Sequence, residues 1–275
     1  MYNAEFKYTR IGFIGTGNMG GALAKAVSRV GYRVCLYDPD TAKRDALADE
    51  IGAKKIDTLF ELLDTCTTVF IGVKPQILEI LAKDARPILD QMKESSPLLI
   101  SMAAGTSIAR LEELFGKRYI IRIMPNTPVS VGKGMTLWCA SDNVFEAQKE
   151  AFKVIMSESG RVDEIDEKLI DAASAVSGCG PAFVYMFAEA LADGGVLCGL
   201  PRDKALTYAA QTLSGAAEYL MASGEHPGKL KDNVCSPGGT TIEGVRTLEE
   251  NGFRSAATEA VIAAYEKTLK LAKKN

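Results

Sequence analysis

The fold prediction rests on one stretch near the N-terminus, Ile11-Gly12-Phe13-Ile14-Gly15-Thr16-Gly17-Asn18-Met19-Gly20. Its first four residues predict a short strand, and the Gly-x-Gly-x-x-Gly pattern opens a predicted helix over residues 21–30. In that setting Gly15 permits a tight turn, Gly17 lets the backbone approach a pyrophosphate, and Gly20 lets the helix pack closely on the strand. The start of the helix adds free N–H groups and a partial positive charge. The predicted cofactor contacts here are Gly15, Thr16, Gly17, Asn18, Met19 and Gly20.

The second predicted strand, residues 34–37, ends at Asp38, which bears on the choice of cofactor. A carboxylate at this place accepts hydrogen bonds from the adenosine ribose hydroxyls and repels a 2′-phosphate. The alternative is a simple turn residue ahead of Pro39. Lys43 and Arg44 follow shortly after and are able to approach a phosphate. Asp38 therefore favours NADH, with NADPH left open.

Further strands are predicted over residues 69–73, 98–102 and 120–124, with a helix over residues 41–50. Several of these strands are apolar on both faces, as expected for a parallel sheet covered by helices. The alternation predicts an α/β Rossmann domain, with a doubly wound and mostly parallel sheet, over residues 1–163. Two segments at strand ends leave room for ribose and nicotinamide. They are Gly72, Val73, Lys74 and Pro75, and Ala103, Ala104 and Gly105; for Lys74, a solvated surface position is an equal alternative.

After residue 163 the pattern changes to helices, over residues 185–197, 204–222 and 255–273. An all-α domain is therefore predicted over residues 164–275. Its apolar helix faces, in residues 206–220 and 257–269, exceed what one small domain buries, which indicates a subunit interface. The uncharged residues 172–188 contain glycines and a proline, and favour a loop leading into a buried helix over a membrane span.

Composition narrows the class of protein. The 275 residues carry a net charge of −3, which gives no electrostatic reason to expect nucleic acid or a membrane as partner. The N-terminal residues lack the apolar run of a secretory signal, and six scattered cysteines without a Cys-x-x-Cys pair indicate reduced thiols. We therefore expect a cytoplasmic protein without a metal site. The one histidine, His226, precedes Pro227 and is interpreted as a loop residue, not a general base.

The most informative part of the second half is the run Asp232-Asn233-Val234-Cys235-Ser236-Pro237-Gly238-Gly239-Thr240-Thr241-Ile242-Glu243. Gly238 and Gly239 expose backbone N–H groups just before a predicted helix, as in a nest for a carboxylate. Thr240 with Glu243 fits a capping box, so a well-capped helix is the other interpretation. The spacing alone leaves both open.

Taken together, these segments resemble the pyrroline-5-carboxylate reductase family over nearly the whole chain. The resemblance is carried by the glycine loop, by Val73-Lys74-Pro75 and Ala103-Ala104-Gly105, by Arg122-Ile123-Met124-Pro125-Asn126-Thr127-Pro128, by Ser177-Gly178-Cys179-Gly180-Pro181, and by the run from Asp232 to Thr241. It implies a Rossmann domain and a helical domain through which subunits form homodimers, often within larger rings. Many members that favour NADPH carry Ser or Asn-Arg where this chain has Tyr37-Asp38.

The resemblance also implies a reaction, the reduction of 1-pyrroline-5-carboxylate to L-proline by NADH or NADPH in the last step of proline biosynthesis. The substrate, a cyclic imine carboxylate, would be held by Ser236, Gly238, Gly239, Thr240 and Thr241, with Thr241 as the catalytic residue near the ring nitrogen. A protonated imine needs little acid–base machinery, which agrees with a single histidine. Two alternatives stay open: a hydroxy-acid dehydrogenase, for which the helical half offers no convincing base, and a dinucleotide-sensing protein without turnover, which has no need for the nest.

Overall fold

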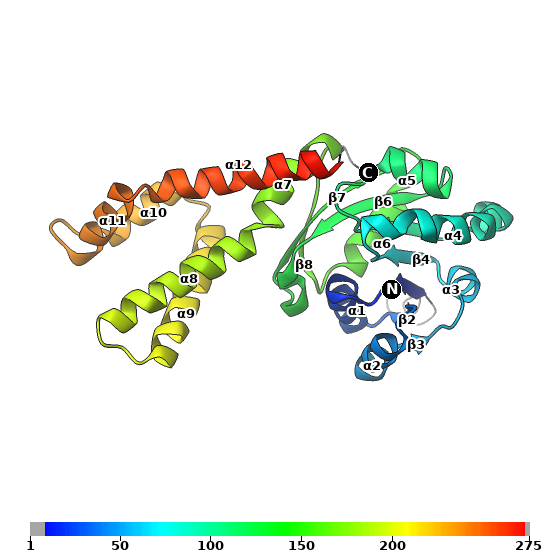
Figure 1. Ribbon diagram of the computed structural model, residues 1–275, viewed down its shortest axis with the longest axis horizontal. Helices are drawn as coiled ribbons and strands as arrows, with labels where there is room; N and C mark the ends of the chain where they lie inside the picture. The colour runs from blue at the N-terminus through cyan, green and yellow to red at the C-terminus, as the bar shows by residue number, and fades with distance from the viewer. Residues whose placement is uncertain (1–8, 273–275) are drawn as a thin grey trace. The chain divides into compact units, whose positions relative to one another are not determined.

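The computed structural model describes residues 9–272, and its first part is built on one eight-stranded sheet (Figure 1). The strand order is β3-β2-β1-β4-β5-β6-β7-β8, and every neighbouring pair is parallel except β6 and β7. The strands are β1 (Arg10–Ile14), β2 (Arg33–Tyr37), β3 (Lys54–Lys55), β4 (Thr68–Ile71), β5 (Leu98–Ser101), β6 (Ile120–Pro125), β7 (Gly134–Ala140) and β8 (Gly160–Glu164). The predicted α/β class with a mostly parallel sheet is confirmed.

Helices cover both faces of this sheet. They are α1 (Asn18–Val30), α2 (Thr41–Ile51), α3 (Leu59–Thr65), α4 (Leu78–Met92), α5 (Ile108–Phe115), α6 (Glu146–Ile155) and α7 (Glu167–Ser177), with short 3-10 turns η1 (Pro75–Ile77), η2 (Lys93–Ser95) and η3 (Thr127–Val131). Side chains of α1, α2 and α6 share one apolar cluster with Phe13 and Phe70, whereas those of α3, α4 and α5 share another with Ile14 and Ile71. The strands therefore alternate their side chains between two cores, as a doubly wound sheet requires.

A buried arginine holds α7 against the sheet. Arg122 of β6 is 4% exposed, and its guanidinium contacts Glu167 at 3.0 Å and Asp171 at 2.8 Å. Glu167 also accepts a hydrogen bond of 2.7 Å from the backbone N–H of Ile108 at the start of α5. These bonds fix the first turn of α7, because the paired carboxylates have few other ways to satisfy their charge once partly buried.

Within the described residues the chain forms two compact units. The first runs up to Gly178 and takes in the chain again from Ala264, and the second is Cys179–Ala263. The predicted boundary between residues 163 and 164 falls within β8 and stays a prediction. The second unit contains α8 (Gly180–Leu197), α9 (Arg202–Ser223), α10 (Pro227–Val234), α11 (Thr240–Glu250) and the first part of α12 (Phe253–Ala272). The prediction of helices after the sheet domain is confirmed.

The second unit buries few side chains. Helices α8 and α9 lie side by side (Figure 1), and the buried cluster there consists of Ala192, Ala205 and Ala209. The prediction of a buried helix within residues 172–188 is wrong, since Tyr185 and Met186 are 63% and 70% exposed. The cause is that α9 covers only the small residues of α8. Among the described residues, the stretch Glu167–Leu197 is long enough to cross a membrane, and an 18-residue window within it has a mean hydropathy of 1.3 with 11% of the window buried.

Candidate functional site

The glycine loop passes between the carboxyl ends of β1, β2 and β4. Gly15 has a φ of +94°, donates a 2.9 Å hydrogen bond to the Tyr37 carbonyl, and has no room for a Cβ, which would lie 2.9 Å from the Gly72 oxygen. A Cβ on Gly20 would lie 2.2 Å from the oxygen of Gly15. Both positions therefore require glycine, one for its backbone angle and both for close backbone approach.

Gly17 differs from these two glycines because a Cβ there would meet nothing within 4 Å. It is the N-cap residue of α1, and no side chain caps the helix. Gly17 and Asn18 are exposed, so the first N–H groups of α1 face open space. An uncapped helix N-terminus carries free donors and a partial positive charge, which suits a pyrophosphate.

A cavity of about 880 Å³ opens at this loop. It is lined by four predicted loop residues, Thr16, Gly17, Asn18 and Met19, and by predicted Gly72 and Lys74 at the end of β4. It continues between α1 and α2, where Lys25, Lys43, Leu47 and Glu50 line it together with Ser130 of η3. Sequence reasoning did not find Lys25 or Ser130. The available signal was a lysine in each of the two helices that flank the cavity, Lys25 in the second turn of α1 and Lys43 in the first turn of α2.

The remaining predicted cofactor residues lie outside this lining. Gly15 and Gly20 are buried beneath it, and Val73 and Pro75 continue the chain beside Lys74. Ala103 is 2% exposed and packs into a core cluster, while Ala104 is exposed and Gly105 partly so at the end of β5. The structure thus gathers the glycine loop and Gly72 around one cavity, and the cofactor roles of the β5 segment stay predictions.

Asp38 is tied to the glycine loop. Its Oδ2 accepts hydrogen bonds from the backbone N–H of Thr16 at 2.6 Å and from the Thr16 hydroxyl at 2.8 Å. Its Oδ1 accepts one from the backbone N–H of Asp40 at 2.9 Å. A carboxylate offers about four lone-pair positions, so one is left for a ribose hydroxyl. Asp38 therefore orients the loop whether or not it also binds ribose.

Arg44 is not available to a phosphate, in contrast to the sequence expectation. It is 6% exposed, and its guanidinium bonds to the Ile56 carbonyl at 2.8 Å and to Asp57 and Asp45 at 2.7 Å. The guanidinium donates its hydrogen bonds within α2 and to the chain that follows β3, so it joins these two segments. Lys43, by contrast, lines the cavity and pairs with Asp40 at 2.7 Å.

The candidate substrate loop joins α10 to α11 in the second unit. The predicted capping box of Thr240 and Glu243 is wrong, because Gly239 is the N-cap and Glu243 instead accepts a 3.1 Å bond from Arg246. The helix starts one residue earlier than expected because Gly238, with φ of +69°, and a 3.0 Å bond from the Gly239 N–H to the Ser236 carbonyl form a tight turn.

This correction leaves the start of α11 open. No side chain caps it, and Ser236, Gly238, Thr240 and Thr241 are exposed, with Gly239 half-buried. Among the described residues no hydrogen bond occupies the Thr241 hydroxyl. His226 serves elsewhere, since its Nδ1 accepts a 3.1 Å bond from the Gly228 N–H at the start of α10. The loop therefore presents backbone donors and one unused hydroxyl, which fits a carboxylate with a neighbouring polar atom.

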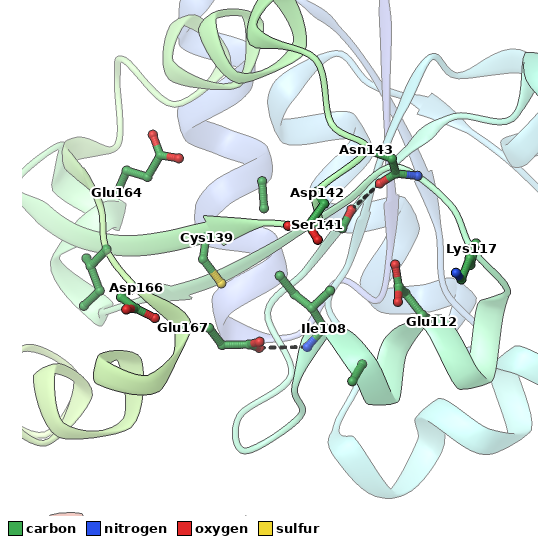
Figure 2. Close-up of a pocket in the computed structure, with 13 residues that line it drawn as sticks. Ile108, Glu112, Lys117, Cys139, Ser141, Asp142, Asn143, Glu164, Asp166 and Glu167 are labelled. Carbon is green, nitrogen blue, oxygen red and sulfur yellow. Dashed lines mark hydrogen bonds between the residues drawn. The ribbon is translucent and has the colours of Figure 1, made fainter.

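A second cavity, of about 770 Å³, lies where β7 and β8 end (Figure 2). Its wall is mainly acidic, with Glu112, Asp142, Glu164, Asp166 and Glu167 around Cys139 and Lys117. Burial, with a smaller effect of the Glu167 charge, raises the pKa of the Cys139 thiol to about 12. Carboxylates repel phosphate, so this cavity does not suit a dinucleotide. Within residues 9–272 no group of three or more His, Cys, Asp or Glu side chains is placed to hold a metal ion.

Comparisons with known proteins match the two halves separately and the chain as a whole. Residues 167–271 match the family described as pyrroline-5-carboxylate reductase dimerisation, and residues 10–105 match NADP oxidoreductase coenzyme F420-dependent. The pyrroline-5-carboxylate reductase of Synechocystis sp. is 43% identical over 270 residues, covering 96% of this chain and 99% of that protein. The Escherichia coli enzyme of the same name is 41% identical over 271 residues, covering 96% and 98%.

Solved structures give the same result. A pyrroline-5-carboxylate reductase from Coxiella burnetii superposes with a TM-score of 0.88 at 30% identity, over 96% of this chain and 99% of that one. Pyrroline carboxylate reductase from Plasmodium falciparum, solved with NADP bound, has a TM-score of 0.83 at 36% identity, over 94% and 98%.

Proposed function

Because the chain belongs to the pyrroline-5-carboxylate reductase family, we propose that it reduces 1-pyrroline-5-carboxylate to L-proline with NADH or NADPH. This is the last step of proline biosynthesis. The observation that carries the proposal is that both predicted binding loops are glycine-built helix starts without a side-chain cap, at α1 and at α11. Each offers free backbone donors to an anion, and the two anions are the cofactor pyrophosphate and the substrate carboxylate.

The residues of the first unit bind and orient the dinucleotide. The N–H groups after Gly17 would bind the pyrophosphate, and Asp38 holds the loop through Thr16. Gly72 lets the end of β4 approach the glycine loop, because a Cβ there would lie 3.1 Å from the Gly15 oxygen. Gly15 and Gly20 keep α1 pressed against β1, which places its N-terminus at the edge of the sheet. When bound, the reduced nicotinamide supplies a hydride. The chain's own contribution is to hold it in position.

The loop of the second unit binds the substrate. Backbone N–H groups after Gly239 contact the carboxylate, with Ser236 and Thr240 at its sides, and the free hydroxyl of Thr241 hydrogen-bonds the ring nitrogen. The imine is electrophilic once protonated, so hydride addition to its carbon needs no side chain acting as a base. A hydroxy-acid dehydrogenase needs a base that takes the proton of the substrate hydroxyl, and His226 is bonded in a helix cap.

We also propose that the enzyme is cytoplasmic, assembles as a homodimer or a higher ring, and has no nucleic-acid or membrane partner. The match of residues 167–271 to a dimerisation family supports self-association, and it gives the apolar stretch Glu167–Leu197 a protein surface to face. The net charge of −3 supports the absence of polyanionic partners. Static light scattering of the purified chain tests the dimer.

The reaction is tested by following the absorbance of reduced nicotinamide when 1-pyrroline-5-carboxylate is added, with proline measured as product. We expect oxidation of NADH or NADPH that depends on the cyclic imine. We expect no reduction of NAD+ or NADP+ when 2-hydroxy or 3-hydroxy acids are supplied instead. Binding of the dinucleotide without imine-dependent oxidation would leave the dinucleotide-sensing alternative as the correct one.

A further inference from the structure

The cavity beside the glycine loop has one lysine whose position differs from that of the other basic residues around it. Lys43, on the first turn of α2, lines the cavity together with Thr16, Gly17 and Asn18. Its ammonium contacts Asp40 at 2.7 Å, and the side chains of Lys43 and Asp40 are 69% and 43% exposed. The hydrogen bond to Asp40, and then the Asp40 charge, raise the pKa of Lys43. Lys43 follows the end of β2 by six residues, on the first turn of the next helix.

The end of β2 is where a Rossmann domain meets the adenosine ribose, and thus where the 2′ position lies. The other basic groups are held away from it. Arg44 is buried against Asp45 and Asp57, and Lys25 pairs with Glu50 at 2.6 Å between α1 and α2. Lys74 stands at the end of β4, on the other side of the loop from β2. Lys43 is therefore the cation placed to meet a 2′-phosphate.

Asp40 caps α2 and also pairs with Lys43, and a 2′-phosphate of NADPH would compete for this second contact. It is the N-cap of α2, where its carboxylate accepts a 3.2 Å bond from the backbone N–H of Lys43, and it is also the counterion of the Lys43 ammonium. A 2′-phosphate competes with Asp40 for that ammonium and is repelled by the charge of Asp38. NADH has no 2′-phosphate to compete with Asp40, so the ion pair between Asp40 and Lys43 stays intact.

We propose that the Asp40–Lys43 pair sets the choice between NADH and NADPH, with Lys43 binding the 2′-phosphate and Asp40 opposing it. This inference rests on the proposed use of NAD(P)H. It gives a chain with a carboxylate at the end of β2 a means of binding NADPH as well as NADH: Lys43 attracts the 2′-phosphate, and Asp38 and Asp40 limit that attraction.

The test is equilibrium binding of NADPH and NADH, followed by the fluorescence of the reduced nicotinamide, to the full-length protein and four variants. Lys43→Met should weaken NADPH binding roughly ten-fold and change NADH binding by less than about two-fold, because a charge-assisted contact is lost at an exposed site. Asp40→Asn keeps the helix cap, since Asn caps as well as Asp, and should tighten NADPH binding roughly three-fold by releasing Lys43. The NADPH effects should shrink at high salt.

The matched controls are Lys168→Met and Asp166→Asn. Asp166 is likewise the N-cap of its helix, and Lys168 pairs with it at 2.7 Å, but the pair lies at α7, outside the cavity. Both variants should leave the NADPH to NADH ratio unchanged. Equal losses for the two cofactors in Lys43→Met, or no gain for NADPH in Asp40→Asn, would overturn the inference. A wild-type protein that binds neither cofactor would instead overturn the proposed function.

Discussion

Replacing Thr241 by alanine separates a catalytic contact from a structural one. Thr241 does not stabilise the start of α11, because Gly239 is the N-cap of that helix and no hydrogen bond among the described residues uses the Thr241 hydroxyl. The side chain is exposed at the second residue of the helix, where alanine has a higher helix propensity by up to about 0.5 kcal/mol. We therefore expect the melting temperature of Thr241→Ala to stay constant or rise slightly.

The catalytic effect should be much larger. A hydrogen bond to a polar or charged substrate group contributes about 1–3 kcal/mol. Its loss lowers kcat/KM roughly five- to 150-fold. If the contact to the ring nitrogen strengthens only as the hydride moves, the loss appears in kcat. If it is equally strong in the bound substrate, the loss appears in KM.

The assay is steady-state kinetics with the cyclic imine, together with thermal unfolding of the same preparations. Thr247→Ala is the control, because Thr247 is another exposed threonine of α11 and its hydroxyl bonds to the Glu243 carbonyl at 3.0 Å within the helix. Thr241→Ser should recover most of the activity, since it restores the hydroxyl. Unaltered kinetics in Thr241→Ala would remove Thr241 from the site, and a lowered melting temperature would refute the assignment of Gly239 as the cap.

Two further predictions use neighbouring glycines and a buried thiol. Gly17→Ala should weaken dinucleotide binding without changing the melting temperature, because its Cβ enters open space. Gly20→Ala should lower the melting temperature, because its Cβ would lie 2.2 Å from the Gly15 oxygen. Equal effects of the two variants on dinucleotide binding and on melting temperature would contradict this. For Cys139, whose pKa is raised from 9.0 to about 12 by burial, the unfolded state releases a proton above pH 9 that the folded state keeps. Above pH 9 the free energy of unfolding should then fall by up to about 1.4 kcal/mol per pH unit. Denaturant titrations of Cys139→Ala at alkaline pH should show a smaller fall, because the thiol is absent. Equal falls in the wild-type protein and the variant would show that the thiol is not the cause.

The parts of the fold that the sequence predicted are those encoded locally. The strands β1, β2, β4, β5 and β6 are short apolar runs between helical patterns, and the glycine loop is a contiguous motif. β8 was missed because its residues, Gly-Arg-Val-Asp-Glu, are half exposed and gain their order from pairing with β7. β3 is two exposed lysines at the sheet edge. Pairing across the sheet leaves little trace in such short, polar segments.

The candidate site shows the same limit at the level of single residues. Asp38 was predicted from its place after β2, but its bonds to Thr16 join residues 22 positions apart and depend on how the loop returns to the sheet. The capping-box spacing of Thr240 and Glu243 was present in the sequence, yet the turn at Gly238 started the helix one residue earlier. A motif specifies which residues are near in sequence, and the backbone path decides which of them meet.

The helical unit depends on self-association for its stability, because it buries few of its own apolar side chains. Folding a residue costs about 1–2 kcal/mol of backbone entropy, and apolar burial returns about 25 cal/mol per Å². The unit Cys179–Ala263 fully buries only alanines, while Leu197, Met221 and Val234 remain 89%, 69% and 67% exposed. Such a unit has too little core to be stable by itself. Since residues 167–271 match a dimerisation family, we propose that a second copy buries these side chains. The stability of the helices is then linked to association by mass action.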